Sequence, residues 1–329
     1  MEDEAEAEAA KASQALARES PQEEHIFIGD DNDALFRHYL QFTAPHITAT
    51  PTSKSPFIFV VPGLAPRYPY LMHEVLALTA LHLNHLYPHE GQKYLAAAAE
   101  HQSQALNLFR AALQDPPAEA VVPIWLCSAM LVTYYFTLPS DPASLLFNND
   151  FPRPPEWMVL MRGSRLIFQQ HYSALSSHPV IREYIKPYQA PFQRYSPGLD
   201  FPARSTLVSL RDKLVVPPED QEPYSATLDE LTRCFWLSSL GDPESLKSAP
   251  ITFAASVPVE FLSRLTSKHQ PALVVMAFWC VLMHRVPYFG WYKNAKAKEL
   301  LAVLKGDLAP EYLELIRWPI QEIEGDQAA

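Results

Sequence analysis

Hydrophobic residues recur at intervals of three and four along most of the chain, which is the spacing of one face of an α-helix. From 70 to 87 they cover nearly the whole circumference, which predicts a central, buried helix. From 90 to 114 they form one stripe, which predicts an amphipathic helix antiparallel to the first. Further helices are predicted at 120–138, 155–172, 179–187, 206–215, 226–240, 257–268, 271–286, 291–304 and 309–318.

Proline separates these segments. The chain has 31 Pro and only 9 Gly, and Pro-rich connectors such as 151–155 stand between the periodic stretches. One Pro-flanked piece, 55–62, is expected to be extended, but sustained strand-like alternation is scarce. The pattern predicts an all-α fold, with a single large multi-helix domain over residues 25–329.

The first 24 residues form an acidic, low-complexity tail with eight acidic and two basic residues. They carry no apolar stripe that could dock on a core, so we expect a disordered tail. The whole chain has 26 Lys+Arg against 37 Asp+Glu and a formal net charge of −11. Because a phosphate backbone attracts cations, direct nucleic-acid contact is not expected.

One uncharged stretch, residues 120–140, approaches the length of a membrane span. Pro123, Ser128 and Pro139 interrupt it, and Lys or Arg flanks are missing, so a buried core helix is favoured and no membrane span is predicted. The acidic start has no signal-peptide core, and the three cysteines lie in apolar runs. Both features are typical of an intracellular protein.

Histidines in and just after the first long helix are the best candidate metal ligands. His82 and His85 share a helix face, with His89 close behind, but Pro88 breaks the helix and no Cys or Asp joins them. A confident site needs three or four convergent ligands, so neither a metal nor any other cofactor is predicted. A hydrogen-bonded core imidazole is the favoured interpretation of His82.

Motifs for catalysis are absent from the sequence. No Gly-x-Gly pair occurs, which excludes dinucleotide and Walker-type phosphate loops, and Ser164 does not stand in a nucleophile elbow. No catalytic residue is assigned. Arg162 and Arg165, beside Gly163, could bind an anion, although a surface or packing role is favoured because long charged side chains usually stay solvated.

Large aromatic side chains gather in the apolar helices, notably in 125–136 and 275–292. They could form a dense core, or they could surround a cavity for a flat apolar ligand. Composition alone favours the plain core, because most buried aromatic side chains serve packing.

Several short sequences carry a resemblance to a known family. They are Pro62-Gly-Leu-Ala65, Tyr68-Pro-Tyr-Leu-Met-His73, Ala77-Leu-Thr-Ala-Leu-His-Leu83, His101-Gln-x-x-Ala-Leu-x-x-Phe109, Pro154-Pro-Glu-Trp157, Met161-Arg-Gly163 and Trp318-Pro-Ile320. In them the chain resembles the regulatory domain of fungal zinc-cluster transcription factors of the sterol uptake control type. The resemblance covers most of residues 55–320 and is strongest in 68–109.

The resemblance implies an all-α domain that binds a sterol-like lipid in an apolar central cavity, often dimerises, and works in the nucleus and cytoplasm. With the aromatic clusters, it implies a pocket with His82 or His85 as a polar handle. The ligand-binding residues predicted on this basis are Trp125, Tyr134, Tyr135, Met276, Trp279, Met283, Tyr288 and His82.

The chain departs from the family in one respect. The six-cysteine zinc cluster that reads DNA has no counterpart among Cys127, Cys234 and Cys280. Two functions therefore stay open. One is a ligand-sensing regulator that acts as a homodimer or through a DNA-binding partner protein. The other is a small-molecule enzyme of secondary metabolism, a cyclase or isomerase built on the same helical pocket.

Overall fold

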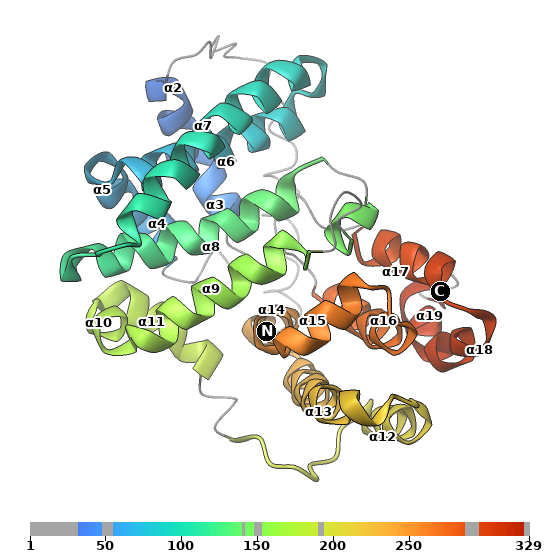
Figure 1. Cartoon of the computed structure of the whole chain (residues 1–329). Helices are drawn as coiled ribbons and strands as arrows, with labels where there is room; N and C mark the ends of the chain where they lie inside the picture. Colours follow the sequence, from blue (N-terminus) through green and yellow to red (C-terminus); the bar gives the residue numbers. More distant parts are fainter. Residues whose placement is uncertain are drawn as a thin grey trace, which may run out of the picture.

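Helices make up nearly all of the fold (Figure 1). The computed structural model describes residues 32–47, 55–139, 142–147, 153–189, 194–286 and 296–325, and no strand occurs among them. The first half comprises α2 (Asn32–His38), the π-helix η1 (Tyr39–Thr43), α3 (Ala44–Ile47), α4 (Pro56–Phe59), α5 (Val61–Leu64), η2 (Ala65–Arg67), α6 (Pro69–Leu86), η3 (Pro88–Glu90), α7 (Gly91–Ala112), η4 (Ala118–Ala120), α8 (Val121–Thr137), η5 (Pro142–Leu145), α9 (Glu156–Gln170), α10 (Tyr172–Ser177) and α11 (Pro179–Gln189).

The second half continues with α12 to α19. These are α12 (Arg204–Lys213), η7 (Pro218–Asp220), α13 (Gln221–Ser238), α14 (Pro243–Ser256), α15 (Val259–Thr266), α16 (Gln270–His284), α17 (Lys296–Asp307), α18 (Pro310–Leu313), η8 (Glu314–Ile316) and α19 (Arg317–Glu324). The all-α prediction is confirmed over the described residues. The predicted tail 1–24 and Tyr288 lie outside them.

The hairpin of α6 and α7 dominates the N-terminal half, as the hydrophobic periodicity predicts. α6 is buried over most of its length because apolar side chains surround it, whereas α7 buries one stripe. Gly91 begins α7 where the two helices approach closely. A Cβ atom at this position would lie 2.8 Å from Oδ1 of Asn84, so the Asn84 side chain would have to move to admit a larger residue.

α8 is the most apolar helix in this half. Its segment Ala118–Thr137 is long and apolar enough to cross a membrane, but most of its most apolar window is buried against the rest of the protein. α8 packs on α6 from one side and on α9 from the other. Its composition is therefore that of a core helix, as favoured from the sequence.

The segment 55–64 corrects a prediction. It is not extended: Ser55 caps α4, its Oγ accepting a hydrogen bond from the backbone N–H of Phe57 at 3.2 Å, and α5 follows directly. Pro56 and Pro62 occupy the first helical turns, where a missing N–H costs nothing. Prolines taken as signs of an extended chain are thus helix starts.

A second correction concerns α14, which the hydrophobic pattern does not reveal. Pro250 lies inside this helix, and its backbone carbonyl accepts the indole N–H of Trp279 at 3.0 Å. Trp279 in turn stacks on Trp157, with ring centroids 5.3 Å apart. The hydrogen bond from Trp279 therefore stabilises α14 at Pro250, the residue whose ring would otherwise disfavour a helix.

Two hydrophobic cores result, and α9 belongs to both. Met158 and Met161 pack in the C-terminal core, which is built around α16, while Ile167 and Phe168 pack against the N-terminal core. In Figure 1, α9 crosses the molecule between α8 and the helices of the second half. α8 also contributes to both, with Val132 and Phe136 in the C-terminal core and Met130 in the N-terminal core, so the junction of the two cores runs along α8 and α9.

One buried carboxyl group stands out in the N-terminal core. Glu74 on α6 is fully buried, and neither carboxyl oxygen has a hydrogen-bond partner among the described residues. Burial raises the pKa of this group well above its usual range, so it stays protonated when the unfolded chain would have ionised. The folded state binds the extra proton, and the free energy of unfolding therefore falls as the pH rises above about 4.5.

We expect Glu74→Met to raise the free energy of unfolding at pH 7 by about 1–3 kcal/mol, because an unpaired polar group is replaced by an apolar side chain of similar length. Urea unfolding at pH 7 and pH 4 measures the effect, and the gain should shrink at pH 4. The exposed Glu100→Met on α7 is the control. A destabilised Glu74→Met protein would show that the carboxyl group has a favourable partner.

Candidate functional site

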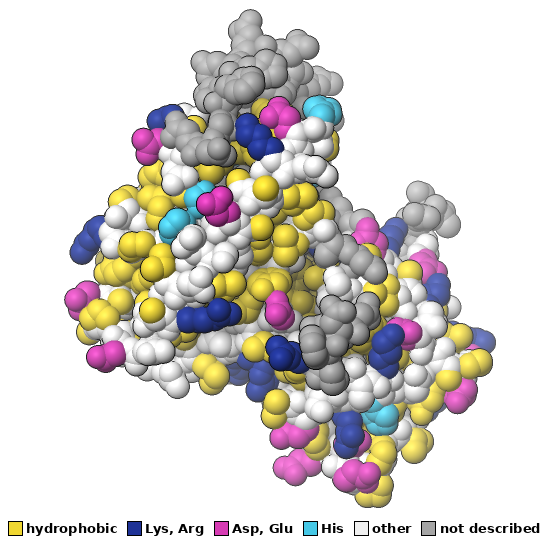
Figure 2. Space-filling model, turned by 45° about the horizontal axis from the view of Figure 1, so that its top comes forward, with side chains coloured by type: hydrophobic (Ala, Val, Ile, Leu, Met, Phe, Trp, Pro, Cys, Tyr) yellow, Lys and Arg dark blue, Asp and Glu magenta, His cyan; other side chains and the backbone are white. Residues whose placement is uncertain are grey.

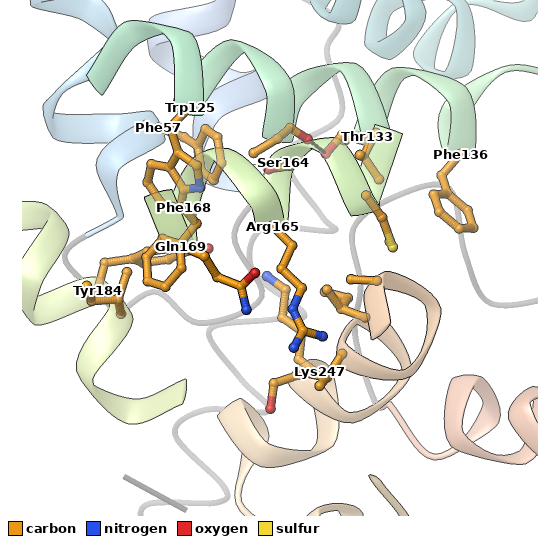
Figure 3. Close-up of a pocket in the computed structure, with 18 of the residues that line it drawn as sticks. Phe57, Trp125, Thr133, Phe136, Ser164, Arg165, Phe168, Gln169, Tyr184 and Lys247 are labelled. Atoms are coloured by element: carbon orange, nitrogen blue, oxygen red, sulfur yellow. Dashed lines mark hydrogen bonds between the residues drawn. The ribbon is translucent and has the colours of Figure 1, made fainter. Parts of the chain in front are cut away.

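A cavity of about 500 Å³ lies where the two cores meet (Figure 3). Helices α8 and α9 form one part of its wall, α11 and α14 another, and α13 contributes Arg233. Its volume is within the range of roughly 300–1,000 Å³ typical of small-molecule sites. The apolar wall includes Phe57, Trp125, Val132, Phe136, Met161 and Phe168.

The aromatic side chains and the charged side chains occupy different parts of the cavity. Figure 3 shows Phe57, Trp125, Phe168 and Tyr184 together toward α8 and α11, while Arg165 points toward α14, near Lys247. The indole of Trp125 packs on the ring of Phe168, with centroids 5.9 Å apart. The cavity is therefore apolar over most of its wall and cationic on the α14 side.

Local sequence explains how α14 brings its side chains to the cavity. Asp242 caps the helix, its Oδ1 accepting the N–H of Ser245 at 2.9 Å, and Pro243 occupies the first turn. Spacing of one, four, five and eight residues from Lys247 brings Ser248, Ile251, Thr252 and Ala255 to the same face.

Three cations and no carboxylate line the cavity among the described residues. Arg233 is already paired, because its guanidinium binds both carboxylate oxygens of Glu230, one turn earlier on α13. Arg165 donates one hydrogen bond to the hydroxyl of Ser256, at the end of α14. Arg162, one turn earlier, donates to the carbonyl of Val257, so both arginines tie α9 to α14.

Lys247 has no such partner. It makes no hydrogen bond or ion pair with any residue that the structure describes. Loss of hydration lowers the pKa of its ammonium group to about 8, while the charge of Glu244 acts in the opposite direction. Desolvation also lowers the pKa of Arg165. The protein therefore holds two positive charges at the cavity without a neutralising carboxylate in the wall.

Of the predicted ligand-binding residues, Trp125 lines this cavity. Tyr134 packs in the N-terminal core, and Tyr135 packs against both cores at their junction. Met276, Trp279 and Met283 are buried in the C-terminal core on α16, outside the cavity wall. Trp279 donates a hydrogen bond to α14 but does not line the cavity, so a substitution there tests the core packing rather than the cavity.

His82 lies elsewhere, in a cluster of imidazoles between α6 and the π-helix η1. Its Nδ1 is hydrogen-bonded to Thr43 Oγ1 at 3.0 Å, and its ring lies 5.4 Å from that of His38 and 5.2 Å from that of His46. Burial, followed by the neighbouring imidazoles, lowers the pKa of His82 to about 2 and that of His38 to about 4. In the described part of the chain no group of three or more His, Cys, Asp or Glu residues could hold a metal ion.

The hydrophobic pattern missed the α14 wall and with it Lys247. A usable signal was present, because Asp242-Pro243 is the combination of cap and first-turn proline that starts a helix. Arg165 was weighed as an anion ligand from the sequence, but only the tertiary structure brings it beside a helix 82 positions further along the chain, counted from Arg165 to Lys247.

The outer surface is less distinctive than the cavity. On the face that Figure 2 shows, basic and acidic side chains are interspersed among apolar ones, and no broad basic patch gathers there. That face therefore lacks the continuous basic surface that would bind a phosphate backbone.

Comparison with known proteins gives one match, to a segment of the N-terminal half. Residues 34–188 match the family model of the fungal specific transcription factor domain. The matched segment ends at α11, so α12–α19 lie beyond it, and the cavity draws its wall from both sides of this boundary. No curated protein matches the chain.

Acid should destabilise the protein through the histidine cluster. Because the pKa of His82 is lowered in the folded state, the unfolded chain binds more protons below pH 6.5, and the free energy of unfolding falls as the pH falls. At pH 5 the loss in free energy of unfolding that is due to His82 is about 2 kcal/mol, because each pH unit below 6.5 contributes about 1.4 kcal/mol.

Urea unfolding of His82→Gln between pH 7 and pH 5 measures this share. We expect the variant to lose about 2 kcal/mol less than the unaltered protein over that range. His89→Gln, which replaces an exposed histidine outside the cluster, is the control. An equal pH dependence in the unaltered protein and His82→Gln would show that His82 does not remain neutral.

Proposed function

We propose that this protein is a transcriptional regulator whose activity is controlled by a small molecule in the cavity, because residues 34–188 match the family model of the fungal specific transcription factor domain. The ligand is a mainly apolar molecule with the bulk of a sterol or a long acyl chain. The protein acts in the nucleus, as a homodimer or with a DNA-binding partner protein.

The observation that supports this proposal is the position of the cavity. It lies at the junction of the two cores, with α9 on one side and α14 on the other. A ligand there contacts both halves at once, so it favours the arrangement of helices that fits it best. Binding then shifts the population toward one arrangement, and the size of the shift is set by the difference in the ligand's affinity for the two arrangements.

The contacts across this junction suit such a response. Apart from side-chain packing, Arg162 and Arg165 bind the last residues of α14 through their guanidinium groups. Polar contacts of this kind can exchange partners with water or with a ligand at a modest net cost, on the order of 1 kcal/mol per hydrogen bond. A small rotation of α14 relative to α9 would change the outer surface of the C-terminal half, where a partner could dock.

A cavity-filling substitution tests the proposal. Ala129 on α8 lines the cavity, so Ala129→Trp should occupy the space and exclude the ligand. The matched control is Ala99→Trp on the exposed face of α7. Native mass spectrometry of each protein, purified from a fungal host, should show a retained ligand in the unaltered chain and in Ala99→Trp but not in Ala129→Trp.

The regulatory role is tested in the same variants. The full chain, fused to an unrelated DNA-binding module, should drive a reporter whose level changes with the ligand, and Ala129→Trp should lose this response. Equal ligand retention by Ala129→Trp and Ala99→Trp would exclude the cavity as the binding site. Return of the extracted ligand in a chemically altered form would support the enzyme alternative instead.

A further inference from the structure

The charge distribution in the cavity constrains the ligand beyond its apolar body. All three charged side chains in the described wall are cations: Arg165, Arg233 and Lys247. Two carboxylates lie outside the wall but act on these cations: Glu230 binds Arg233 with both oxygens and also acts on Arg165, and the charge of Glu244 acts on Lys247. Arg165 and Lys247 therefore remain as an excess of positive charge beside an apolar wall.

Their hydrogen-bonding groups are also largely unused. A guanidinium group has five N–H donors, and Arg165 uses one of them on Ser256 among the described residues. Lys247 carries three ammonium donors and binds none of the described residues. Burying part of a cation whose N–H donors have no partner costs free energy, unless a negatively charged acceptor binds those donors.

The two cations come from different helices and point to the same region. Arg165 extends from α9 toward α14, where Lys247 lies (Figure 3). The aromatic wall of Phe57, Trp125 and Phe168 lies on the other side of the cavity. A neutral sterol would fill the apolar part but would offer the cations a single hydroxyl group.

We infer that the ligand is an amphiphile with one carboxylate, which Arg165 and Lys247 bind while its apolar body lies against Trp125 and Phe168. This inference rests on the proposed function and specifies its ligand class. A long-chain fatty acid and a cyclic apolar acid share this chemistry. Charge-assisted hydrogen bonds from two cations provide the preference for the acid over a neutral molecule of the same shape.

Three ten-carbon probes with different head groups test the inference. Decanoic acid, decan-1-ol and decylamine carry one negative charge, no charge and one positive charge on the same tail. Isothermal titration calorimetry on the full chain at pH 7, below the micellar concentrations, should give an affinity for the acid about 10- to 100-fold above that for the alcohol. The amine should bind more weakly than the alcohol, and acetate, which lacks the tail, should not displace the acid.

Two substitutions assign the preference to its residues. Lys247→Met should remove most of the difference between acid and alcohol and leave the affinity for the alcohol unchanged. Lys213→Met, an exposed lysine on α12, should behave like the unaltered protein. Arg165→Gln provides a second, independent test, and its melting temperature shows whether the contact with Ser256 is needed for folding.

The possible outcomes separate the two proposals. Equal binding of the acid and the alcohol by the unaltered protein would overturn the inference and leave a neutral-ligand sensor standing. A preference that survives in both Lys247→Met and Arg165→Gln would overturn the assignment of the counter-ions. Failure of all three probes to bind, together with an Ala129→Trp variant that responds normally, would overturn the proposed function as well.

Discussion

The packing of α9 between α8 and α14 is the contact on which the rest of the structure depends. α9 contributes Met158 and Met161 to one core and Phe168 to the other, so together with α8 it joins the two cores. The cavity lies at this junction, and its wall combines residues of the matched segment 34–188 with residues of the helices that follow it.

Charge gives this cavity its chemical character. The chain as a whole is acidic, with a formal net charge of −11, yet the described charged side chains of the cavity wall are all basic. Burial disfavours the charged form of an amine, and the lowered pKa of Lys247 reflects this loss of hydration. Arg233 is paired with Glu230 and Arg165 binds Ser256, whereas Lys247 binds no described residue, which is the feature that the proposed carboxylate ligand accounts for.

Much of the fold could be predicted because helical periodicity and proline position are local properties of the sequence. The hairpin of α6 and α7, the apolar helices α8 and α16, and the all-α class all follow from them. The segment 55–62 was predicted wrongly because its prolines were interpreted as flanking an extended piece, whereas Pro56 begins a helix. The helix at α14, which the hydrophobic pattern does not reveal, contains Pro250, where a hydrogen bond from Trp279 binds the helix. The site was harder, because burial alone does not distinguish an aromatic residue of the core, such as Trp279, from one at a cavity wall, such as Trp125.

By itself, the sequence determined the helical class, most of the helix positions and the resemblance to a regulatory domain, since each depends on residues close together in the chain. It also placed Arg162 and Arg165 side by side and left two roles open for them. Only the tertiary structure shows which side chains line the cavity and which pack in a core, because this depends on which distant helix covers each helix face. The meeting of Arg165 with Lys247 depends on the docking of α14 onto α9, a contact between segments that no local pattern connects.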